Sequence, residues 1–128
     1  MTTPRHGSER GQATVELALL LPVVVMVLLA VLQVGLVARD VVLVTHASRE
    51  AVRAAAVDPD ARAPLEAARQ SSGLDPDRLS VRSTGRGEAG SRVTVVVSYR
   101  VRTAVPIVGA LVGDHTVRSR ATMRVEGP

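Results

Sequence analysis

The stretch LALLLPVVVMVLLAVLQVGLVA, residues 17–38, decides the fold. None of these 22 residues carries a charge, and Gln33 is the only amide among them. At about 1.5 Å per residue, a helix of this length extends roughly 33 Å, close to the ~30 Å hydrocarbon thickness of a bilayer. The apolar core of a cleaved export signal is usually only about 7 to 15 residues long. The stretch therefore predicts a retained, membrane-spanning helix.

The segments on either side of this stretch predict a leader and a helical extension. Residues 1–11, MTTPRHGSERG, are polar and rich in turn-forming residues, which indicates a short disordered leader. The helix is predicted from Thr14 to Val57, with Pro22 expected to kink or loosen it. Beyond the span, apolar or small residues recur in steps of three and four up to the helix-breaking pair Asp58–Pro59. The recurring positions are Val41, Val44, Ser48, Ala51 and Ala55.

The C-terminal half predicts a small mixed domain. A second helix is expected over residues 60–72, ended by Gly73, after which apolar residues alternate with a period of two. Strands are predicted over residues 79–83, 93–102 and 117–125, with arginines on the wet face. We therefore predict an α+β fold with a long N-terminal transmembrane and amphipathic helix, a short second helix and a three-stranded antiparallel sheet. Its parts are a leader (1–11), a transmembrane helix (12–38), an amphipathic extension (39–58) and a small α+β domain (59–128).

The apolar connection AVPIVGALVGDH, residues 104–115, has two interpretations. It either folds over an open end of the small core or contacts a partner or the membrane surface.

Composition argues against several functions. The net charge is +4, but all 16 basic residues are arginines spread along the chain, and Tyr99 is the only aromatic residue available for base stacking. We therefore expect no nucleic-acid binding. The chain has no cysteine, which excludes disulfides and thiolate metal sites.

Motifs for catalysis and for cofactor binding are also missing from the sequence. His46 and Glu50 are spaced for a helical metal pair, yet two ligands make no site, and an ion pair between them is the favoured interpretation. No nucleophile elbow, phosphate loop or catalytic carboxylate pair is present, so we expect neither enzymatic activity nor a cofactor.

The N-terminal stretch RGQATVELALLLPVVVMVLLAVLQVGLVARD resembles the signature of TadE-like minor pilins, or pseudopilins, of the tight-adherence pilus system, a branch of type IV pili. The matching features are Arg10–Gly11, Val15–Glu16, Pro22 and Gly35. The segments ASREAVRAAAVDP and ATMRVE are similar to this family as well. Leu17 stands where processed proteins of this system often have an aromatic residue.

The resemblance implies a processing and assembly mechanism. A prepilin peptidase of the inner membrane would cut after Gly11 and leave Gln12 as the new N-terminus, with Glu16 as the fifth mature residue. Glu16 would then pair with the freed amine of an adjacent subunit, whereas without processing it would only offset the helix macrodipole. Pro22 and Gly35 would contribute to a kink in the helix and to its packing against neighbouring helices.

The resemblance also implies partners and a location. The partners would be other pilin subunits, pilus assembly platform proteins, the prepilin peptidase and membrane lipid. The protein would cross the cytoplasmic membrane once, with its C-terminal domain outside the cytoplasm, and could enter the pilus. Arginines lie on both sides of the span, so the positive-inside rule does not decide the orientation.

Two other functions stay open at this point. One is an unprocessed single-pass scaffold protein of a secretion complex. The other is an exported soluble domain that a signal peptidase releases near Ser48.

Overall fold

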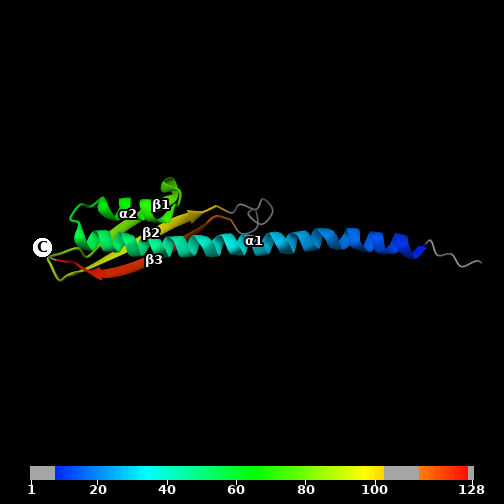
Figure 1. The fold of residues 1–128 in the computed structure, drawn as a ribbon, viewed down its shortest axis with the longest axis horizontal. Coiled ribbons are helices and arrows are strands. Elements are labelled where there is room, and N and C mark those ends of the chain that lie inside the picture. Colours follow the sequence, from blue (N-terminus) through cyan, green and yellow to red (C-terminus); the bar gives the residue numbers. More distant parts are fainter. Residues whose placement is uncertain (1–7, 103–112, 127–128) are drawn as a thin grey trace, which may run out of the picture.

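A computed structural model of the chain describes residues 8–102 and 113–126, with only the backbone described for residues 8–10. The elements follow the order α1, α2, a short 3-10 helix η1, β1, β2 and β3. The C-terminal half of α1 packs with α2 and the sheet into a head domain, while its N-terminal half projects from that domain (Figure 1). This arrangement confirms the predicted α+β fold with one long apolar helix.

Helix α1 extends over Ser8–Val57 and contains 50 residues. It begins six residues before the predicted start at Thr14 and includes residues 8–11, which were assigned to a disordered leader. The prediction counted Gly11 among the turn-forming residues of the leader. One glycine costs about 1 kcal/mol relative to alanine, which is too little to stop a helix whose neighbouring residues are Glu, Arg, Gln and Ala.

Helix α2 extends over Ala63–Ser72 and begins three residues later than predicted. The side chain of Asp58 accepts the N–H of Asp60, and that of Asp60 accepts the N–H of Arg62, so a pair of side-chain turns occupies the expected first turn. The predicted stop is confirmed, because Gly73 follows the helix with φ +62°, in the left-handed region that favours glycine.

The sheet consists of β1 (Leu79–Thr84), β2 (Arg92–Val101) and β3 (His115–Arg124), preceded by η1 (Pro76–Arg78). The strands lie in the order β1-β2-β3, and both pairs are antiparallel. Ser80 pairs with Ser98 across the first pair, and Ser98 pairs with Arg118 across the second. The predicted three-stranded antiparallel sheet is therefore confirmed, while residues 103–112 of the apolar connection lie outside the described residues.

The core lies between α1 and the inner face of the sheet. Alternate residues of β2 are buried against small residues of α1, which let the helix approach the sheet closely. The buried positions on β2 are Val93, Val95, Val97, Tyr99 and Val101, and those on α1 include Val44, Ala47, Ala51, Ala55 and Ala56. Ser48 joins this interface, with its hydroxyl 2.9 Å from that of Ser119 on β3. Of the predicted amphipathic positions only Val41, 43% exposed, stays outside the core.

Two adjacent valines of β2 offer a test of this packing. Val97 is fully buried, while Val96 points to the opposite face and is half-buried. Val97→Ala should lower the free energy of unfolding by about 2 to 3 kcal/mol, because it removes two carbons and leaves a cavity. Val96→Ala should cost less than about 1 kcal/mol. Urea unfolding of the full chain in detergent, followed by circular dichroism, measures both. Equal losses would contradict this assignment of faces.

Candidate functional site

The N-terminal half of α1 presents a continuous apolar surface. Fourteen Val, Leu and Met side chains between Val15 and Val34 are 45–70% exposed. Burying such a side chain is worth about 1.5 to 3 kcal/mol, so leaving all of them in water would forfeit on the order of 20 kcal/mol or more. A domain has a net stability of only about 5 to 15 kcal/mol. Lipid or other apolar helices must therefore cover this surface, and α1 is long and apolar enough to cross a membrane.

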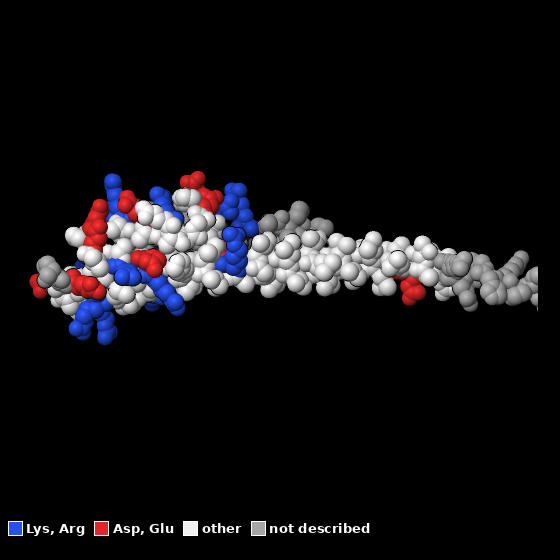
Figure 2. All heavy atoms as spheres, in the orientation of Figure 1, with Lys and Arg blue, Asp and Glu red and all other residues white. Residues whose placement is uncertain are grey.

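Charge is almost absent from this half of the helix. Glu16 is the only charged residue between positions 11 and 38, and Arg39 and Asp40 follow the span. Figure 2 shows the same division, with charged side chains over the head domain and one acidic group on the otherwise uncharged projecting helix. The side chain of Glu16 is exposed. Its carboxylate therefore lies open to a neighbouring chain at the edge of the apolar surface.

The predicted processing site lies inside α1 rather than in an extended segment. Gly11 and Gln12 are both helical and exposed. A Cβ added at Gly11 would meet no atom within 4 Å, and the same holds at Gly35. Neither glycine is thus required by contacts within the described part of the chain. The space beside both stays available to another molecule.

Pro22 does not end the helix, since α1 continues through it. Proline has no N–H, so the carbonyl of Ala18 loses its usual donor four residues on. Membrane helices tolerate such losses.

Gln33 is the one polar side chain of the apolar stretch, and it is buried to 93%, with 7% exposed. Its Oε1 has no hydrogen-bond partner within the described chain. A buried oxygen left without a donor costs about 1 to 3 kcal/mol.

The expected contact between His46 and Glu50 is not formed. Within residues 8–102 and 113–126, the ion pair that forms is Arg78–Asp75, at 3.0 Å. That prediction was therefore wrong. His46 is exposed and Glu50 is half-buried, so an ion pair between them would lie near the surface and gain little. No cluster of three or more potential metal ligands occurs among the described residues.

Cleavage near Ser48 is disfavoured by the fold. Val44, Ala47 and Ser48 are at most 1% exposed and lie within an unbroken stretch of α1. A cut there would divide the helix that forms one side of the core, which argues against the released soluble domain.

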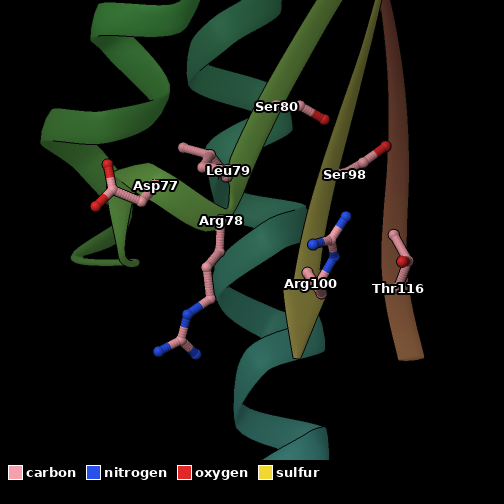
Figure 3. A pocket seen from close by; sticks show the side chains of 7 residues that line it. All are labelled: Asp77, Arg78, Leu79, Ser80, Ser98, Arg100 and Thr116. Carbon is pink, nitrogen blue, oxygen red and sulfur yellow. The ribbon is translucent and has the colours of Figure 1, made fainter. Parts of the chain in front are cut away.

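A hollow of about 200 Å³ opens on the outer face of the sheet, the face opposite α1. Its lining comes from η1 and all three strands and consists of Asp77, Arg78, Leu79, Ser80, Ser98, Arg100 and Thr116. Figure 3 shows Ser80, Ser98 and Thr116 on adjacent strands, with the guanidinium of Arg100 extending toward Ser98 and the side chain of Arg78 pointing away. Sequence analysis missed this hollow, because its residues come together only through the register Ser80–Ser98 and Arg100–Thr116.

Comparison with known proteins identifies the N-terminal part of the chain. Residues 11–53 match the family model of TadE-like protein. This match confirms the resemblance to TadE-like proteins that the motif around Gly11 and Glu16 indicated. Comparisons with curated proteins and with solved structures found no match. The TadE-like segment includes the whole apolar surface and the part of α1 that carries the first core residues. This local resemblance to TadE-like proteins suggests involvement in the tight-adherence pilus system, and the apolar helix fits membrane anchoring.

The orphaned amide of Gln33 gives a prediction for stability. Gln33→Leu should leave the free energy of unfolding unchanged or raise it by about 1 kcal/mol, because it removes a buried acceptor without a donor. Gln70→Leu, at an exposed position of α2, is the matched control and should change stability by less than about 0.5 kcal/mol. Thermal unfolding of the full chain in detergent measures both. A loss of 1 kcal/mol or more at position 33 alone would show that the amide has a partner in the native protein.

Proposed function

We propose that the protein is a membrane-anchored minor pilin or pseudopilin that takes part in assembling a tight-adherence type pilus, with a structural rather than a catalytic role. The observation that carries the proposal is the bipartite surface of α1 in a TadE-like segment. Its N-terminal half is exposed and apolar, and its C-terminal half forms one side of the head domain. Such a helix anchors the subunit in lipid before assembly and offers the same surface to neighbouring helices afterwards.

In this proposal a prepilin peptidase cuts between Gly11 and Gln12. Peptidases bind their substrates as extended backbone, so the first turns of α1 must unwind there. Unwinding is easiest at the end of a helix, where the backbone N–H groups lack helical partners. It is also easier at a glycine, because glycine loses more conformational freedom in a helix than other residues do. Removing the leader leaves a free amine at Gln12, four residues before Glu16.

Glu16 is proposed to pair with that amine on an adjacent subunit. A carboxylate at the edge of an apolar helix bundle is stable only when it has a partner. Between positions 11 and 38 the chain supplies no cation of its own. The exposed position of Glu16 supports a contact between chains, with pilin subunits and pilus assembly platform proteins as the partners. The proposed location is the cytoplasmic membrane, crossed once, with the head domain outside the cytoplasm.

The alternative is an unprocessed single-pass scaffold protein of a secretion complex. One observation favours it, namely that Gly11 and Gln12 lie within helix rather than in an extended segment. N-terminal sequencing of the protein from membranes with an active prepilin peptidase separates the two functions. Gln12 as the first residue supports the pilin, and Met1 or Thr2 supports the scaffold.

Two glycines of α1 give a matched pair of variants for processing. Alanine fits without a clash at both Gly11 and Gly35. Gly11→Ala should abolish or strongly slow cleavage, because it places a side chain at the cleaved bond and strengthens the helix by about 1 kcal/mol. Gly35→Ala should be processed normally. The ratio of precursor to mature protein on immunoblots measures both, and equal processing of the two variants would refute cleavage at Gly11.

The role of Glu16 is tested by removing its charge. Glu16→Gln should reduce incorporation into pili, or pilus number, by at least about tenfold if the carboxylate pairs in the bundle. Glu66→Gln removes an exposed carboxylate of α2 and should have no effect. Counting pili by electron microscopy, with membrane levels of each variant as the reference, measures the difference. Normal pilus assembly with Glu16→Gln would contradict the pairing between subunits. The role of Glu16 would then be limited to its interaction with the helix macrodipole.

A further inference from the structure

The outer face of the sheet carries charge of a single sign. Directly opposed residues of antiparallel strands share a face, so the registers place six arginines there. They are Arg82, Arg92, Arg100, Arg118, Arg120 and Arg124. The three strands contain no Asp or Glu. The chain uses only arginine as its basic residue, but that does not explain why acidic residues are missing from the sheet. The chain has 12 acidic residues, and all of them lie outside the three strands.

These arginines have no partner among the residues that the structure describes. None of the six makes an ion pair or a side-chain hydrogen bond with another described residue. Arg92 and Arg124 even lie directly opposite each other, an arrangement that is unfavourable unless an anion lies between or beside them. The face therefore has unused capacity for an anionic partner.

The hollow brings unpaired polar groups from adjacent strands close together. Ser80, Ser98 and Arg118 form one row across the sheet, and Arg100 with Thr116 forms the next row toward the end of β2. Short side chains at Ser80 and Ser98 leave room above the backbone. Their hydroxyls make no hydrogen bond within the described chain, whereas Thr94 and Thr122, farther along the same face, bond to each other at 2.9 Å. Free hydroxyl donors beside a guanidinium suit the oxygens of a phosphate group.

The hollow opens a short distance beyond the end of the apolar span. Ser48 bonds to Ser119, and Ala56 accepts the N–H of Glu126, so β3 extends along α1 in the same direction. Ser48 is ten residues beyond Ala38, or about 15 Å along the helix, and Thr116 is three residues before Ser119, or about 10 Å along the strand. Thr116 therefore lies roughly 5 Å beyond the span. The polar headgroup layer of a bilayer is about 5 to 8 Å thick on each side, so the Arg100–Thr116 end of the hollow falls within it. The row of Ser80 and Ser98 lies about 7 Å farther from the span.

We propose that the hollow lined by Ser80, Ser98, Arg100 and Thr116 binds the phosphate of an anionic phospholipid, which holds the head domain against the membrane surface. The ligand chemistry is a phosphate group, and the position beside the span selects lipid as its source. The inference rests on one part of the proposed function, namely that residues 17–38 cross the bilayer. It is independent of cleavage at Gly11.

The test uses the full chain in detergent, with native mass spectrometry to count bound lipid at increasing concentrations of phosphatidylglycerol or phosphatidylcholine. The chain should retain phosphatidylglycerol in preference to phosphatidylcholine. Arg100→Gln removes the guanidinium that extends toward Ser98, and Ser98→Val fills the hollow with a residue that suits a strand. Each should weaken phosphatidylglycerol binding about five- to tenfold, the effect of one charge-assisted hydrogen bond near the surface. Arg124→Gln removes the same charge at the far end of β3 and should weaken binding less than twofold.

Several outcomes would overturn the proposal. Equal losses with Arg100→Gln and Arg124→Gln would mean diffuse attraction by the whole face. Displacement of the lipid by millimolar inorganic phosphate would identify a site for a free anion. Absence of a preference for phosphatidylglycerol would refute an anionic lipid site. The Ser98→Val result counts only if this variant has the same thermal midpoint of unfolding as the unmodified chain. If its midpoint is lower, the Arg100→Gln variant, whose substitution is exposed, decides the test alone.

Extraction of membranes with alkaline carbonate tests the span separately. Release of the protein by carbonate would refute the membrane-spanning helix, and with it both the anchor and the lipid site. Retention in the membrane together with no lipid preference would refute the hollow alone.

Discussion

The burial of one long helix is the constraint on which the rest of this structure depends. Helix α1 has apolar or small residues along its whole length, but the chain supplies a cover for only its C-terminal half. The sheet and α2 bury that half, and the other half needs a cover from outside the chain. A large free energy favours that cover, because the exposed surface would forfeit more in water than a domain of this size gains on folding. The need for an external cover therefore follows from how apolar surface is divided along a single helix, and a membrane anchor fits that need.

The core of the head domain depends on close packing of the sheet against the same helix. Its core contains no Phe or Trp, and valines of β2 meet alanines and serines of α1 at close range. Small residues along α1 let the sheet lie close to the helix, which compensates for the small size of each buried side chain. The contact depends on α1 remaining helical through residues 44–56, which is why release near Ser48 does not suit the fold. The apolar half of α1 and the head domain are joined by one continuous helix.

The polar groups mark the places where we propose that this chain contacts other molecules. Glu16 lies at one end of the apolar span, and the hollow with Arg100 lies near the other, so the two proposed contacts are separated by roughly the thickness of a bilayer. Each involves charge left without a partner in the described chain. Gln33, between them, is instead covered by the protein itself. A subunit held at both membrane surfaces would have a fixed depth and tilt, as regular assembly with neighbours requires.

The sequence by itself determined the elements and the class of fold. A span of 22 residues without charge indicates an apolar helix, and the alternation over Val93–Val101, interrupted only by Val96, indicates a half-buried strand. Both patterns reflect the local geometry of one element. The motif around Gly11 and Glu16 indicated the TadE-like family for the same reason, since it lies within one short stretch. Tertiary structure alone decided which residues meet. The start of α1 at Ser8, the missing His46–Glu50 pair and the burial of Gln33 depend on competition among distant or weak contacts. The hollow between Ser80, Ser98 and Arg100 depends on strand register, which is set by hairpin geometry and by which face the core buries, and no local pattern encodes it.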